Sequence, residues 1–195
     1  MNPVQILSEG GILLYPTDTI YGLGVDASNV EALKKLRALK GREEGKPISI
    51  VVADMAMAEE YAVVTPLARK IAEAFLPGKV TLILEAKPNV SEELTAGSGT
   101  VGIRIPNHLV CLNLARELGR PYTATSANVS DQETKKTPQE ILEQFGEKAI
   151  HIARVIDTGE LPESLPSTVV DARGLSPIVV REGAVDKELI LEIRP

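Results

Sequence analysis

The chain of 195 residues carries a net charge of −6, and 44% of its residues are apolar while 25% are charged. This balance is typical of a soluble protein that buries one core, and it argues against disorder, a fibrous structure and binding of nucleic acid through overall charge. No apolar run approaches the roughly 18 residues of a membrane-spanning helix, and the first residues lack a signal-peptide pattern, so we expect a cytoplasmic protein with no membrane partner.

Strand and helix patterns alternate along the chain. In the first half they predict, in order, a strand at 11–15, a helix at 29–39 capped by Asn29, a strand at 47–53, a helix at 66–75 and a strand at 80–84. In the second half they predict a strand at 101–106, a helix at 109–118, a strand at 122–125, a helix at 138–145, and β-rich segments at 149–157, 167–171 and 178–181. Such alternation favours one α/β domain over residues 1–195, with a mixed sheet because the last two segments have hairpin-like spacing.

The few cysteine and histidine residues restrict metal chemistry. Cys111 is the single cysteine, so an internal disulfide and a cysteine-rich zinc cluster are excluded. His108 and His151 leave little for a histidine-based site, and we predict no metal held by protein side chains. Cys111 lies in an apolar helical pattern and is expected to be a buried structural thiol.

The segment at 14–24, LYPTDTIYGLG, ends the first predicted strand on a proline and three oxygen-bearing side chains. Either it is an ordinary turn, which Asp18 or Tyr21 fixes by local hydrogen bonds, or a polar ligand lies against the strand end. We favour the local role for Asp18. With a ligand present, Gly22 and Gly24 would let the backbone turn away beneath it.

Other polar residues stand near predicted element ends, and each alone has a structural explanation. Lys40 and Arg42 can be solvated cations at a helix C-terminus. Arg104 can face outward from an alternating strand, and Ser126 and Asn128 can cap a turn. The residues alone leave both explanations open.

Seven motifs, taken together and in order, resemble the signature of the YrdC-like threonylcarbamoyl-AMP synthases. They are PTDTIYGLG at 16–24, KGREEGKPISIVV at 40–52, PGKVTLIL at 77–84, VGIRIPNH at 101–108, TSAN at 125–128, PSTVVD at 166–171 and REG at 181–183. The resemblance covers nearly the whole chain. It implies a twisted mixed α/β sheet flanked by helices, with a concave basic cavity. It also implies a nucleotidyltransferase that makes threonylcarbamoyl-AMP and pyrophosphate from L-threonine, bicarbonate and ATP, after which a separate transferase modifies a tRNA adenosine next to the anticodon.

The resemblance also implies two groups of site residues. The ATP group is Lys40, Arg42, Lys46, Thr100, Ser126, Asn128, Thr134 and Arg181, with Lys40 and Arg42 as catalytic residues. The threonine group is Thr19, Arg104, Ala124 and Ser167. The chemistry fits, because an arginine can clamp a carboxylate and cations can stabilise charge at the attacked phosphate. No general base stands out, so catalysis would rest on positioning and charge, with Mg²⁺ on the ATP phosphates.

The chain departs from the family pattern at Val51, where relatives often have a histidine that contacts threonine. The resemblance is to the short form that lacks an additional C-terminal domain, so the polar segment 130–137 is expected to be a mobile loop that closes the cavity, with 158–166 as a second loop. Two alternatives stay open. One is a double-stranded RNA or tRNA-binding module, against which the acidic charge and few aromatic residues argue. The other is a carbamoyl-transfer domain like that of hydrogenase-maturation proteins, which carry zinc-finger regions.

Overall fold

The computed structural model describes residues 2–43 and 45–194. Its strands are β1 Ile12–Tyr15, β2 Gly22–Gly24, β3 Ser49–Val51, β4 Ala62–Val63, β5 Val80–Ala86, β6 Thr100–Arg104, β7 Tyr122–Ser126, β8 Ile152–Val155, β9 Thr168–Asp171 and β10 Ile178–Arg181. Its helices are α1 Pro3–Ser8, α2 Val30–Lys40, α3 Met55–Tyr61, α4 Pro66–Phe75, α5 Glu92–Thr95, α6 Leu109–Leu118, α7 Pro138–Phe145, the 3₁₀ helix η1 Gly146–His151 and α8 Lys187–Leu191.

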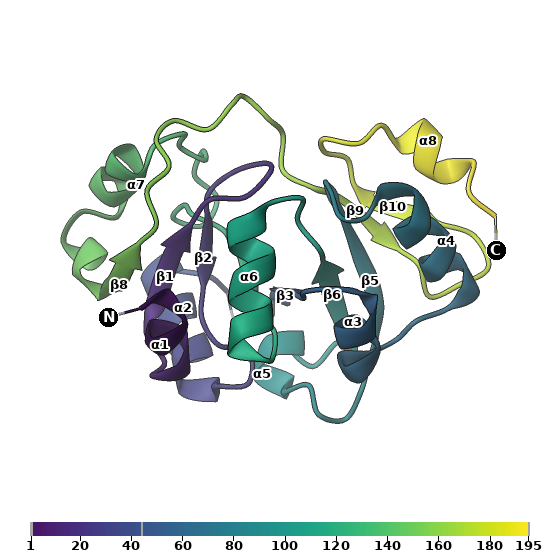
Figure 1. The fold of residues 1–195 in the computed structure, drawn as a ribbon, viewed down its shortest axis with the longest axis horizontal. Helices are drawn as coiled ribbons and strands as arrows, with labels where there is room; N and C mark the ends of the chain where they lie inside the picture. The colour runs from purple at the N-terminus through teal and green to yellow at the C-terminus, as the bar shows by residue number, and fades with distance from the viewer. Residues whose placement is uncertain (1, 44, 195) are drawn as a thin grey trace.

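Within the described residues the ten strands form one mixed sheet in the order β10-β9-β5-β6-β3-β7-β2-β1-β8, and β4 pairs with β5. Three pairs are parallel, β1 with β8, β3 with β6 and β5 with β9, and the others are antiparallel. Figure 1 shows β8 and β10 at opposite edges and α6 in front of the central strands. The predicted mixed α/β sheet is therefore confirmed.

The predicted helices begin and end where capping residues stand. Asn29 Oδ1 accepts a hydrogen bond of 3.0 Å from the Ala32 amide and starts α2, which ends at Gly41 with a left-handed φ of 62°. Gly119, with φ 69°, ends α6 in the same way. The β-rich prediction at 149–157 is only partly right, because η1 runs to His151 and the strand covers 152–155. None of the helices in the described chain combines the length and hydropathy that a membrane span requires.

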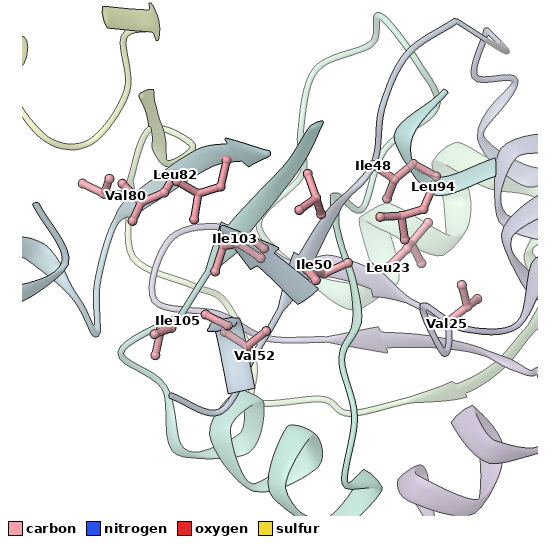
Figure 2. Packing of buried hydrophobic residues seen from close by; sticks show 14 of the residues in the cluster. Leu23, Val25, Ile48, Ile50, Val52, Val80, Leu82, Leu94, Ile103 and Ile105 are labelled. Atoms are coloured by element: carbon pink, nitrogen blue, oxygen red, sulfur yellow. The ribbon is translucent and has the colours of Figure 1, made fainter. Parts of the chain in front are cut away.

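The two faces of the sheet bury different clusters, because successive strand side chains point to opposite faces. The larger cluster joins alternate residues of neighbouring strands, including Leu23, Ile50, Leu82 and Ile103, with apolar residues of α2, α4 and α7. Figure 2 shows these four side chains projecting into one layer.

The opposite face carries a smaller cluster, in which Leu13, Tyr15 and Tyr122 meet apolar residues of α1 and α6. Cys111 lies in this cluster with no exposed surface, and its Sγ donates to the Pro16 carbonyl at 3.2 Å. Burial raises the pKa of this thiol to about 12, so the prediction of a buried structural thiol is confirmed. Only part of this face is covered by helices, and the rest carries a pocket.

Gly22 and Gly24 lie inside β2, so the predicted role in turning the chain away from a ligand is wrong. A Cβ on Gly22 would lie 2.8 Å from Cζ of Tyr15. A Cβ on Gly24 would lie 3.0 Å from both the Tyr15 ring and the Tyr122 ring, and these two rings pack edge to face at 5.1 Å. The glycines are therefore needed because only a residue without a Cβ leaves room for the tyrosine rings of the smaller cluster.

Replacing Gly22 with alanine is expected to lower the free energy of unfolding by about 1–3 kcal/mol, because the added methyl group has to displace the buried Tyr15 ring. Chemical denaturation measures this loss. Gly45→Ala is the matched control, because a Cβ there would meet nothing within 4 Å. Equal losses in the two variants would contradict the ring-seating role.

Candidate active site

A pocket opens on the sheet face that carries the smaller cluster. Its lining comes from strand ends and from the loops after β1 and before β9, and it encloses about 150 Å³. The lining residues are Tyr15, Thr17, Ile20, Tyr21, Gly22, Arg42, Pro47, Ser49, Val51, Thr81, Arg104, Pro106, Ala124, Thr125, Ser126, Pro166, Ser167, Val169 and Arg181.

The register of the sheet explains why residues distant in sequence meet here. Arg104 lies opposite Val51 on one side and opposite Thr81 on the other, and Thr81 lies opposite Val169. Paired residues share a face, so these side chains form one row across β3, β6, β5 and β9. Val51 stands where the resemblance implies a histidine, and it gives this wall an apolar surface.

Six of the predicted site residues line the pocket: Arg42, Arg104, Ala124, Ser126, Ser167 and Arg181. Thr19 supports it from behind. Its Oγ1 lies 2.6 Å from Nη2 of Arg104 and 3.0 Å from Oγ1 of Thr17, and the residue is buried. The 14–24 segment therefore contacts the pocket arginine, and Thr19 points to the same face as Arg104.

Asp18 binds Arg104, and the local turn role predicted for it is wrong. Its Oδ1 accepts from Nη2 of Arg104 at 2.7 Å, and its Oδ2 accepts from the Asn107 amide at 3.1 Å. The turn is fixed instead by Thr17, whose Oγ1 accepts from the amides of residues 19 and 20 and donates to the Ile20 carbonyl.

The guanidinium of Arg104 is only partly used. Asp18 and Thr19 both contact Nη2, while Nε is buried and has no hydrogen-bond partner among the described residues. A buried N–H without a partner is unfavourable by about 1–3 kcal/mol. A carboxylate that binds Arg104 has to use Nε or Nη1, or displace Asp18 from Nη2.

Two further arginines line the pocket and donate to backbone carbonyls, Arg42 from two nitrogens, one of them Nε to the Lys46 carbonyl at 3.4 Å, and Arg181 from one. Nη2 of Arg42 donates to the Pro47 carbonyl at 2.7 Å, and Nη2 of Arg181 donates to the Ser167 carbonyl at 2.7 Å. Burial lowers the pKa of Arg42, and the charge of Arg37 lowers it further. Burial also lowers the pKa of Arg181, with a smaller contribution from the charge of Arg104. Crowded, partly desolvated cations of this kind favour an anionic ligand.

Lys40 lies behind the pocket and is not among its lining residues. It is 1% exposed, and its Nζ contacts the Ser126 and Asn128 carbonyls and Asn128 Oδ1. Burial, and then the charge of Arg42, lowers the pKa of Lys40 to about 7. Its predicted contact with ATP stays a prediction.

The pKa of Lys40 predicts a pH-dependent stability. Between its folded value of about 7 and its unfolded value of 10.5, the folded protein binds fewer protons than the unfolded chain. The free energy of unfolding therefore rises with pH in this window, by at most about 1.4 kcal/mol per pH unit. Urea unfolding of the natural chain and of Lys40→Met from pH 6 to 9 measures the difference. Parallel pH profiles in the two proteins would contradict the lowered pKa.

Four other predicted ATP residues lie outside the pocket lining, and one of them is Asn128, whose Oδ1 accepts from Lys40. Lys46 pairs with Asp131 at 3.6 Å, and Thr100 Oγ1 lies 2.9 Å from Ser98 Oγ at the opposite end of β6 from Arg104. Thr134 lies in the 130–137 segment, none of which lines the pocket. Their roles, and closure of the cavity by this segment, stay predictions.

Thr81 was missed as a functional candidate in the sequence, and Tyr21 was considered only for local hydrogen bonds in the 14–24 turn, whereas its hydroxyl contacts residues 158 and 159. Thr81 Oγ1 lies 2.8 Å from Ser167 Oγ inside the pocket, and a polar residue within the apolar VTLIL strand was the available indication. Tyr21 donates to the Gly159 carbonyl at 2.8 Å, which joins the 14–24 segment to the chain between β8 and β9. That chain arches over the end of the sheet where the β1–β2 loop lies (Figure 1).

The pocket does not provide a protein-held metal site. Its rim carries three arginines, and the carboxylate of Asp18 already binds one of them. In the part of the chain that the structure describes, no three histidine, cysteine or carboxylate side chains come together as ligands. The donor set therefore fits anions and does not fit Mg²⁺ bound by the protein alone.

The chain matches the Sua5/YciO/YrdC family model, described as telomere recombination, over residues 5–183. The threonylcarbamoyl-AMP synthase of Bacillus subtilis is 35% identical over 187 residues, which cover 95% of this chain and 53% of that protein. The crystal structure of Pyrococcus abyssi Sua5 complexed with L-threonine superposes with a TM-score of 0.89 at 33% identity, covering 98% of this chain and 57% of that one. Escherichia coli YciO superposes with a TM-score of 0.86 at 28% identity, covering 96% and 90%.

The chain thus spans little more than half of the Bacillus and Pyrococcus proteins and most of YciO. The likeness extends over sequence and fold alike, from α1 to the residues after β10. The chain belongs to the Sua5/YciO/YrdC family.

Proposed function

We propose that this domain is an L-threonylcarbamoyladenylate synthase. The observation that carries the proposal is a small pocket with three arginines, paired hydroxyls and an unpaired buried N–H of Arg104. The activity is the one for which the Bacillus relative is named, and the Pyrococcus relative has been crystallised with L-threonine.

The Arg104 row forms the threonine end of the site. The pocket volume of about 150 Å³ suits a ligand as small as an amino acid, since sites for larger ligands usually measure about 300–1,000 Å³. Arg104, which Thr19 holds at Nη2, binds the carboxylate, the hydroxyls of Thr81 and Ser167 face the side chain, and Ala124 completes the pocket. ATP therefore extends from this volume past Arg42 and Arg181, which also line the pocket.

The chemistry requires positioning and charge stabilisation by the protein. The threonine nitrogen forms a bond to the carbon of bicarbonate, water leaves, and a carbamate results. One carbamate oxygen then bonds to the α-phosphorus of ATP as the bond to the pyrophosphate oxygen breaks. Arg42 and Arg181 stabilise the charge on the phosphoryl oxygens and on the leaving pyrophosphate. Magnesium enters with ATP, whose phosphates supply the ligands that the protein lacks.

The product is a mixed anhydride, so a separate transferase that delivers the threonylcarbamoyl group to tRNA is the proposed partner. A cytoplasmic place fits this role. The RNA-binding alternative is less favoured because the net charge is −6 and the chain has no tryptophan. The carbamoyl-transfer alternative is less favoured because the Bacillus relative, at 35% identity, is named for the synthase activity.

The test is pyrophosphate release from ATP, bicarbonate, magnesium and L-threonine. Release that depends on threonine is expected, and Arg42→Met should lower turnover by roughly tenfold or more, equivalent to about 1.4 kcal/mol. The melting temperature of this variant should stay within a few degrees. Glu31→Gln on the exposed face of α2 is the control. No threonine-dependent release would overturn the proposal, and unchanged turnover in Arg42→Met would overturn its phosphate role.

A further inference from the structure

In its charged, ammonium form Lys40 has no hydrogen-bond donor left for a ligand. An ammonium group has three N–H donors and no acceptor. In Lys40 these face three oxygens of one turn, the Ser126 carbonyl, the Asn128 carbonyl at 2.6 Å and Asn128 Oδ1 at 3.2 Å. The side chain is 1% exposed and lies outside the pocket lining.

The segment 126–130 contacts Lys40, the last residue of α2, through its backbone and its side chain. The Ser130 amide donates to the Lys40 carbonyl at 2.8 Å, so backbone and side chain of one residue both hold the turn. Asn128 Nδ2 donates to the Gln132 carbonyl at 2.6 Å, and Oδ1 accepts from Lys40. The Lys40 ammonium can only donate and the Gln132 carbonyl can only accept, so together they fix which way the Asn128 amide points.

The turn forms part of the pocket, and Lys40 stands behind it. Ser126 lines the pocket, while its hydroxyl donates to Asn128 Oδ1 at 2.5 Å. The Ser126 oxygen therefore offers lone pairs to a ligand, which suits a hydroxyl or amine group better than a phosphate oxygen.

We infer that Lys40 is a positioning residue, which holds the turn at 126–128 in the shape that completes the pocket and does not itself bind nucleotide phosphates. This differs from the role that the resemblance implies. The inference rests on the proposed function for the identity of the ligand as a nucleotide, but the hold on the turn is independent of any ligand.

Two measurements on Lys40→Met test the inference, with Arg42→Met as the matched control because Arg42 is a nearby cation that lines the pocket. The first is amide hydrogen exchange of residues 126–130 without ligand. Exchange should become faster by about tenfold or more in Lys40→Met and stay unchanged elsewhere in β7, whereas Arg42→Met should leave the turn as it is.

The second measurement compares the dissociation constants of ATP and AMP. Lys40→Met should raise the dissociation constants of ATP and AMP by the same factor, within about threefold. Arg42→Met should raise the dissociation constant of ATP at least about fivefold more than that of AMP. The double variant Lys40→Met/Asn128→Ala should bind no more weakly than the poorer single variant. Unchanged exchange, together with a loss confined to ATP in Lys40→Met, would overturn the inference.

Asn128→Ala keeps the test decisive if Lys40→Met does not fold. This variant removes one acceptor and leaves the charge of Lys40 in place. It should show the same faster amide exchange in the turn and an equal loss of affinity for ATP and for AMP. Unchanged exchange and affinity in Asn128→Ala would overturn the inference. If the natural chain binds neither nucleotide, the proposed function fails and the exchange result alone decides the role of Lys40.

Discussion

Replacing Arg104 with methionine is expected to raise the KM for L-threonine by roughly 30- to 5,000-fold, with a much smaller change in the KM for ATP. Truncating one partner of a buried, hydrogen-bonded charge pair generally weakens binding by about 2–5 kcal/mol. Here the substrate carboxylate loses its cation, and Asp18, whose side chain is 9% exposed, loses the guanidinium that it contacts at 2.7 Å. Initial rates at varied threonine and saturating ATP measure the effect.

Two variants separate weaker binding of threonine from damage to the fold. Arg104→Lys keeps the charge but cannot use the forked geometry of the guanidinium, so it should fall between the natural chain and Arg104→Met. Asp18→Asn keeps the shape of the side chain and removes the charge that anchors Nη2. It should raise the KM for threonine because Arg104 is then less firmly placed. A change confined to the KM for ATP in Arg104→Met would place threonine elsewhere.

Local patterns predicted most of the fold because local interactions decide those elements. The cap at Asn29 and the left-handed glycine after α6 specify helix ends by themselves. β2 was missed because the sequence GLG has no alternation of its own, and pairing to β1 and β7 makes it a strand. The glycines there are dictated by the Tyr15 ring, which no local pattern reveals.

The site was predicted to the extent that strand ends and family motifs specify it. Arg104 stands out as a charge within the apolar VGIRI strand, and the structure brings it together with Ser167 and Arg181. The burial of Lys40 could not be predicted, since its partners Ser126 and Asn128 are 86 and 88 residues away in sequence. Thr81 was missed because its place beside Arg104 depends on strand order and register.

Discrimination between amino acids provides the second large expected effect. Valine has the shape of threonine with a methyl group in place of the hydroxyl, and we expect its kcat/KM to be lower by about 10²–10³. A site whose buried polar groups lose all partners rejects such an analogue by about 10⁴–10⁵. Here the hydroxyls of Thr81 and Ser167 lie 2.8 Å apart and satisfy each other in part when valine is bound, so the discrimination is smaller.

Serine separates the contribution of the methyl group from that of the hydroxyl. It keeps the hydroxyl and lacks one methyl, which in an apolar pocket is worth roughly 10- to 200-fold, so serine should be a better substrate than valine. Val51 and Val169 provide the apolar surface for this methyl group. Competition assays with the three amino acids at equal concentration measure both ratios in one experiment.

The variant Thr81→Val assigns the discrimination to the hydroxyl pair. It keeps the volume of the side chain, removes one hydroxyl and should reduce the preference for threonine over valine by about tenfold, the value of one lost hydrogen bond. Thr123→Val is the matched control, because Thr123 is equally buried but contacts the Val25 amide at 3.0 Å and does not line the pocket. The control should lower stability and leave the preference unchanged. An equal preference in Thr81→Val and the natural chain would mean that the substrate hydroxyl does not contact the row beside Arg104. The hydroxyl pair of Thr81 and Ser167 would then not select threonine over valine.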